Sequence, residues 1–145
     1  MTDVQKQQAE FMVAMGKELS TSPNAEPPCD DIILANKLVE EEMQELVDEM
    51  GMVLVHCRGG EPLDEDLLKN VVSEAADFVY VLMQYLNVLG LPFQEVYDAI
   101  HTANMKKMGP DGKPVYREDG KVLKPEGWQR ADILAIIREA KKESI

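Results

Sequence analysis

Acidic side chains gather in two short stretches of the sequence, and their spacing could create a metal site. The first stretch contains Glu41, Glu42 and Glu45, and the second contains Glu74 and Asp77. A helix turns by about 100° per residue, so the first three side chains would share one narrow arc of a helix. The other two are three residues apart, which makes them neighbours on one helix face. Oxygen-only ligands favour hard cations, and the five carboxylates therefore predict a site for Mg²⁺ or Mn²⁺.

The residues around the second stretch favour this interpretation. Apolar residues occur on all sides of the helix expected around Glu74, so the pattern predicts a buried helix. A lone buried charge costs several kcal/mol, which means that such carboxylates must be paired, protonated or metal-bound. Lys69 is the only base nearby in this helix. The alternative is an ordinary solvated acidic face on the helix that contains Glu41, Glu42 and Glu45, with Glu74 and Asp77 in salt bridges to lysine or arginine.

Other catalytic centres fit the sequence less well. A di-iron bundle would use Glu-x-x-His pairs, and the sequence offers only the imperfect pair of Asp98 and His101. There is no Ser-His-Asp, phosphate-loop or GxGxxG pattern. A hard divalent cation remains the best match to the acidic residues.

The elements that would position these residues are helices. Apolar residues recur with helical spacing along most of the chain, and Gly, Pro and Asp mark the ends of the segments. The predicted helices cover residues 4–19, 29–59, 64–89, 92–109 and 131–143. Between the last two, the sequence around Asp119-Gly120 predicts either a small hairpin or an ordered loop. We therefore expect an all-α bundle of four to five helices, with a long C-terminal loop before the last helix, forming a single domain over residues 1–145.

Composition limits the classes of partner. The chain has 145 residues and a formal net charge of −12, which disfavours binding to nucleic acid or to an anionic membrane. The two cysteines form no CxxC motif and are expected to be reduced thiols. The N-terminal stretch lacks the features of a signal peptide. These observations predict a cytoplasmic protein.

The acidic motifs also resemble those of a known superfamily. The pattern Glu41-Glu42-x-x-Glu45 followed by Glu74-x-x-Asp77 resembles the signature of the MazG-like all-α nucleoside triphosphate pyrophosphohydrolases. That superfamily includes dimeric dUTPases and phosphoribosyl-ATP pyrophosphohydrolases. The segment HTANMKKMGPDGKPVYREDGKVLKPEGWQRADI is similar to the C-terminal part of a bacterial and phage subgroup, some members of which act on dUTP.

This resemblance implies a reaction in which a nucleoside triphosphate and water give a nucleoside monophosphate and pyrophosphate, with Mg²⁺ as cofactor and Mn²⁺ as a substitute. The expected substrate is a pyrimidine deoxynucleotide such as dUTP or dCTP. Glu42, Glu45, Glu74 and Asp77 match the main metal ligands. Glu41 matches the glutamate that contacts a further metal or positions the attacking water, so Glu41 and Glu42 are the expected catalytic residues.

The resemblance also implies substrate-binding residues near the C-terminus. Asn104 and Lys107 match polar residues that face the triphosphate or sugar, although Lys107 could equally be a cation at a helix C-terminus. Lys124 is a further phosphate candidate, as are Lys121 and Arg117. Trp128 could stack on a base or cap the core.

The sequence also predicts an oligomeric state and leaves two alternative functions open. The apolar third helix and the resemblance predict a homodimer or a dimer of dimers. One alternative is an enzyme of the same fold that acts on phosphoribosyl-ATP. The other is a non-enzymatic helical adaptor whose acidic residues only form a surface.

Overall fold

The computed structural model describes residues 3–143, and its regular elements are all helices. They are α1 (Val4–Ala14), α2 (Cys29–Gly59), α3 (Glu65–Val88), α4 (Phe93–Met105) and α5 (Ile133–Glu143). The predicted all-α fold is confirmed. The chain divides into two compact units, a first unit that ends at Leu91 and a second unit that begins at Pro92.

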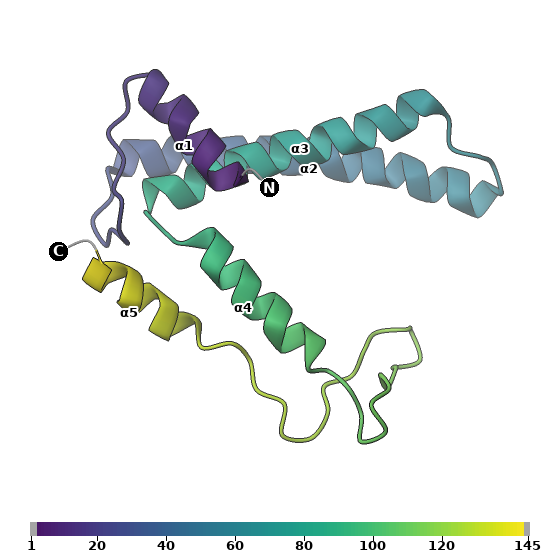
Figure 1. Cartoon of the computed structure of the whole chain (residues 1–145). Coiled ribbons are helices and arrows are strands. Elements are labelled where there is room, and N and C mark those ends of the chain that lie inside the picture. Colours follow the sequence, from purple (N-terminus) through teal and green to yellow (C-terminus); the bar gives the residue numbers. More distant parts are fainter. Residues whose placement is uncertain (1–2, 144–145) are drawn as a thin grey trace. The chain divides into compact units, whose positions relative to one another are not determined.

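The first unit is built on α2 and α3, which lie side by side and run in opposite directions (Figure 1). Acidic Asp30 and Asp31 occupy the first turn of α2, where the helix dipole favours negative charge. As predicted, α2 continues through Gly51 and ends at Gly59, because the next residue, Gly60, adopts a left-handed φ of 67°. A single glycine inside a helix costs only about 1 kcal/mol, so the long apolar contact with α3 is enough to keep α2 continuous.

Asp64 begins α3 as the sequence predicted. Its carboxylate accepts a hydrogen bond from the backbone N–H of Leu67 at 2.7 Å, which satisfies one of the free donors at the helix start. At the other end, Gly90 has a φ of 63°. A Cβ at this position would lie 2.0 Å from the backbone oxygen of Ser22, so the loop before α2 packs directly on Gly90.

α1 is shorter than predicted, and one of its buried residues is polar. It ends at Ala14 rather than at Leu19, because Gly16 adopts a φ of 84° two residues later. Met12 and the polar Gln8 are its buried residues. The side-chain oxygen Oε1 of Gln8 accepts a hydrogen bond from the side-chain Nδ2 of Asn87 in α3 at 2.9 Å. α1 therefore contacts α3 partly through a buried polar pair, which hydrophobic periodicity cannot reveal.

α3 is not enclosed on all sides, which corrects the expectation from its apolar sequence. Its buried residues are Leu67, Met83, Asn87 and Val88. Leu68 and Val72, on another face, are 52% and 66% exposed. The first unit supplies α1 and α2 as neighbours of α3, and two helices cover only part of the surface of a third.

The second unit contains α4, α5 and the long segment between them. α4 ends at Met105, earlier than the predicted Gly109, and α5 begins two residues after the predicted Ala131. In the connecting segment, Tyr116 and Val122 form an isolated antiparallel bridge, so the hairpin alternative is the correct one. Gly120, with a φ of 88°, occupies its turn.

A membrane-spanning helix needs about 20 predominantly apolar residues in succession. Within residues 3–143, no single helix is both long and apolar enough to qualify. α3 and α4 reach the required length and composition only when they are counted together.

Candidate active site

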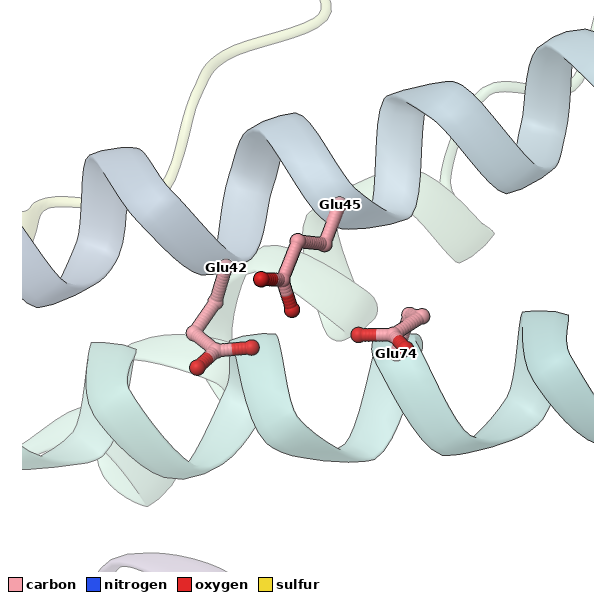
Figure 2. Close-up of side chains that lie close together, drawn as sticks. All are labelled: Glu42, Glu45 and Glu74. Carbon is pink, nitrogen blue, oxygen red and sulfur yellow. The ribbon is translucent and has the colours of Figure 1, made fainter.

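Three carboxylates from two helices converge in the first unit. Glu42 and Glu45 extend from α2 toward α3, and Glu74 extends from α3 toward them (Figure 2). One oxygen from each side chain lies within 4.8 Å of the others. The spacing of Glu42 and Glu45 places both on the face of α2 that meets α3. Three acids at this separation repel one another unless a proton or a cation lies among them.

The electrostatics of the cluster reflect this crowding. Partial burial, followed by the neighbouring charge of Glu45, raises the pKa of Glu42 above its usual value. The same two causes, in the same order, raise the pKa of Glu74. Both shifts mean that the carboxylates hold protons more readily than they would in water. Bound cations would reverse this preference, because positive charge stabilises the ionised form.

One carboxylate oxygen of Glu74 lacks a hydrogen-bond partner. Glu74 Oε2 is buried and has no hydrogen-bond partner. A buried acceptor without a partner costs about 1–3 kcal/mol, so a ligand that contacts this oxygen would stabilise the site. Among the ion pairs between described residues, none includes Glu42, Glu45 or Glu74. Lys69, the nearby base, pairs with Asp66 instead. The salt-bridge alternative for Glu74 therefore finds no counter-ion.

The other two predicted acids lie at the edge of this group. Glu41 is exposed, and so is Asp77; neither belongs to the group of three. Their charges still reach the cluster, because Asp77 and, to a smaller extent, Glu41 raise the pKa of Glu42. The expected burial of Asp77 is wrong, since α3 is open to solvent on this face.

A basic pocket lies in the second unit. It has a volume of about 570 Å³ and is lined by residues of α4 and of the segment that follows it. Lysine and arginine predominate among its polar residues, and the described lining contains no carboxylate. The cations are Lys107, Arg117, Lys121, Lys124 and Arg130. In a chain with a net charge of −12, such a local excess of positive charge favours an anionic ligand.

All four of the predicted substrate-binding residues line this pocket. They are Asn104, Lys107, Lys124 and Trp128. Asn104 lies in the last turn of α4, whereas Lys107 follows the end of that helix. The prediction that Lys107 lies inside the helix is therefore wrong. The Lys107 ammonium lies 4.9 Å from the centre of the Trp128 ring, and that of Lys124 lies 5.3 Å from the same centre.

Arg130 is a pocket residue that sequence reasoning missed. It lies in the irregular segment before α5, where no periodicity assigns a residue to a face. Arg117 also lines the pocket, but it donates a hydrogen bond from Nε to Asp119 at 2.8 Å. That hydrogen bond, followed by the backbone N–H of Lys121, lowers the pKa of Asp119. Arg117 is therefore partly neutralised, and Arg130 is the better additional candidate.

Comparison with known proteins assigns the family. Residues 9–104 match the family model described as phosphoribosyl-ATP pyrophosphohydrolase, which covers more than half of the chain and includes the whole carboxylate cluster. A comparison with curated proteins gave no match. The match overturns the non-enzymatic alternative, because this is a family of hydrolases that act on phosphoric anhydride bonds in nucleotides. The chain thus belongs to the phosphoribosyl-ATP pyrophosphohydrolase family, within the MazG-like all-α nucleoside triphosphate pyrophosphohydrolase superfamily.

Proposed function

We propose that the protein is a Mg²⁺-dependent pyrophosphohydrolase that cleaves the bond between the α- and β-phosphates of a nucleotide 5′-triphosphate. The observation that carries this proposal is the convergence of Glu42, Glu45 and Glu74, with one buried oxygen of Glu74 left without a partner. The family match supports the reaction class. The chain is proposed to be a single catalytic domain, and its first unit carries the metal ligands.

The residues present fit a hard divalent cation. Glu42, Glu45 and Glu74 would hold Mg²⁺, with Mn²⁺ as a substitute, and Asp77 completes the ligand set from α3. All the donors are carboxylate oxygens, which suit these ions better than zinc or a di-iron centre. When bound, the metal would neutralise phosphate charge and make water a better nucleophile.

The side chains divide the remaining tasks. In the reaction, water attacks the α-phosphorus in line, the α–β anhydride bond breaks, and pyrophosphate leaves with its electron pair. Glu41 is exposed beside the cluster and is the candidate to accept the proton of the attacking water. Glu42 is the second catalytic residue, because it belongs to the cluster and is next to Glu41 in sequence.

A Glu41→Gln variant should lower kcat while it retains Mn²⁺ binding.

The basic pocket is the proposed contact for the anionic part of the substrate. Lys107 and Lys124 would act as point charges on phosphate oxygens. Asn104 can donate its amide protons to phosphate or to sugar hydroxyls. Both ammonium groups lie in a pocket without a carboxylate among its described residues, so they are available to an incoming anion.

Two substrate classes have specific support. Phosphoribosyl-ATP is the first candidate, because the family model that matches residues 9–104 carries its name. A pyrimidine deoxynucleotide such as dUTP or dCTP is the second, because residues 101–133, most of which lie beyond the match, resemble the subgroup that includes enzymes acting on dUTP. Both kinds of substrate have a 5′-triphosphate, so the same chemistry serves either.

One assay panel tests the proposal and separates the candidates. Purified protein is incubated with phosphoribosyl-ATP, dUTP, dCTP, dTTP and dATP, and pyrophosphate release is measured with Mg²⁺ and with EDTA. Mg²⁺-dependent release from at least one substrate is expected, and the ratio of kcat/KM values identifies the preferred class. Absence of release from every triphosphate would contradict the proposed reaction.

A homo-oligomer is also part of the proposal. Several large apolar side chains of α2 and α3 are exposed; they include Met43, Val47, Met50, Leu68 and Val72. Exposed apolar surface is often covered at protein interfaces, and a second copy of the chain would cover these side chains in a dimer or a dimer of dimers. Cys29 and Cys57 are exposed free thiols, which agrees with a reducing, cytoplasmic environment. The acidic net charge agrees with a small-molecule substrate rather than long nucleic acid.

A further inference from the structure

Trp128 occupies an unusual position in the basic pocket, because two lysines approach its ring. The ammonium nitrogens of Lys107 and Lys124 lie over the indole at 4.9 and 5.3 Å from its centre. The electron-rich face of tryptophan attracts a cation more strongly than any other side-chain ring. The ring surface is therefore already in contact with charged groups before any ligand binds.

The ring is also fixed in place by the backbone. Its indole N–H donates a hydrogen bond of 2.7 Å to the carbonyl oxygen of Ala103, near the end of α4. The backbone N–H of Trp128 donates to the oxygen of Pro125 at 3.1 Å, which closes a turn with Gly127 at a φ of 78°. A reorientation of the ring to stack on a base would break the Ala103 contact. The half-buried indole thus behaves as a fixed support.

We propose that Trp128 is a positioning residue that holds Lys107 and Lys124 as a preformed pair for a phosphate or diphosphate group. Two ammonium groups near one ring repel each other, and the ring face offsets part of that repulsion. Because the ring restrains both side chains beforehand, less rotamer entropy is lost when an anion binds. This inference relies on the proposed function only for the identity of the anion, as part of a nucleotide triphosphate. Lys107, Lys124 and Trp128 lie outside the family match, which ends at Asn104.

Base stacking and lysine positioning predict that substitution of Trp128 weakens the binding of different ligands. A stacking tryptophan would affect nucleosides and nucleotides but not an anion without a base. A positioning tryptophan affects inorganic pyrophosphate, which has no base. Inorganic pyrophosphate is therefore the probe, added to the 145-residue chain in EDTA so that no metal contributes.

The experiment measures pyrophosphate binding by titration calorimetry for wild type, Trp128→Leu and Trp128→Phe. Leucine removes the ring, and the cost of ordering two freed lysine side chains on binding corresponds to about a fivefold loss of affinity. Phenylalanine keeps a weaker ring face, so its loss should be roughly twofold. Tyr97→Leu is the matched control, because Tyr97 is an exposed aromatic of the same unit that does not line the pocket; its affinity should equal that of wild type.

A double-mutant cycle keeps the test decisive if Trp128→Leu also disturbs folding. In a Lys107→Ala/Lys124→Ala background, adding Trp128→Leu should cause no further loss of pyrophosphate affinity. If Trp128→Leu lowers pyrophosphate affinity in that background as much as it does when both lysines are present, the proposal is overturned. Unchanged pyrophosphate binding by Trp128→Leu, together with weaker binding of a nucleoside, would also overturn it and support base stacking.

The outcome is separable from that of the proposed function. If no triphosphate is hydrolysed but pyrophosphate binding depends on Trp128, the reaction class is wrong and the positioning role stands. If hydrolysis is observed and Trp128→Leu changes neither pyrophosphate binding nor KM, the positioning role is wrong alone.

Discussion

The two units gather opposite charges by different means. In the first unit, carboxylates meet because two regular helices face each other, and each residue is placed by helical spacing. In the second unit, cations meet in a pocket because an irregular segment folds back on the end of α4, where Trp128 bonds to Ala103. Regular helices give short, fixed separations suited to a metal ion, whereas loops of long cationic side chains suit a larger and variable anion.

The largest expected effect comes from breaking the carboxylate cluster. Glu42→Gln, and likewise Asp77→Asn, should reduce Mg²⁺-dependent pyrophosphate release by at least about 100-fold, because even outer-shell partners of metal ligands change activity by 10–100-fold. Glu40→Gln is the matched control, since Glu40 is exposed on the same helix and bonds to Asn36. Full activity in both variants would refute the assignment of the cluster.

A second prediction compares how the two units use glycine. Gly90→Ala should lower the free energy of unfolding by about 3 kcal/mol, because the new methyl group would meet the Ser22 backbone and φ is positive. Gly112→Ala in the second unit should lower it by only about 1 kcal/mol, since φ is positive but the space is open. Urea denaturation measures both. Equal effects would mean that the loop before α2 does not pack on Gly90.

A third prediction tests the cations of the pocket. Lys107→Ala should raise KM about tenfold with a smaller change in kcat, because a hydrogen bond to a charged group contributes about 1.5 kcal/mol. The effect should shrink as salt is added. Lys106→Ala serves as the control, because Lys106 is the exposed neighbour that does not line the pocket. The same KM for both variants would remove Lys107 from the site.

The smallest expected effect is on how stability depends on pH, and this dependence has opposite signs in the two units. The raised pKa values of Glu42 and Glu74 stabilise the metal-free fold fully below the usual glutamate pKa, and this stability is lost as the pH rises through the raised values. Asp119 has a lowered pKa, so its contribution is present above the usual aspartate pKa and is lost as the pH falls through the lowered value.

Melting temperatures measured in EDTA across this acidic range check the sign. For wild type, the melting temperature should rise as the pH falls from neutral toward the usual glutamate pKa. Glu42→Gln should flatten that rise, because it removes one shifted group and relieves Glu74 of a neighbouring charge. Asp119→Asn should not change this rise in melting temperature. An identical rise in wild type and Glu42→Gln would show that the cluster does not titrate in this way.

Much of the first unit could be predicted from the sequence. Helical periodicity and breakers located α2 and α3, and Asp64 was identified as the start of α3. The same periodicity placed Glu41, Glu42 and Glu45 on one arc of α2, of which Glu42 and Glu45 lie in the cluster and Glu41 lies outside it. It did not reveal how much of α3 stays exposed, because the number of neighbouring elements is a tertiary property. The end of α1 was missed because Gly16 stops that helix earlier than the apolar pattern suggests.

The second unit was less predictable for a physical reason. Its pocket depends on where an irregular segment lies, and no spacing rule assigns Arg130 or Trp128 to a shared surface. The resemblance to known enzymes suggested Asn104 and Lys107, with Lys124 as a further phosphate candidate. The contacts of Trp128 with two lysines could not be anticipated, because they depend on the turn at Gly127 and on the bond to Ala103.

The central claim is that the carboxylates of α2 and α3 hold the catalytic metal. Anomalous scattering from crystals grown with Mn²⁺ tests it most directly, because the signal locates the ion independently of activity. The account predicts an anomalous peak within coordination distance of Glu42, Glu45 and Glu74, and no such peak in Glu42→Gln/Glu74→Gln crystals. Mn²⁺ bound elsewhere, with this cluster empty in an enzyme that turns over its substrate, would contradict the account.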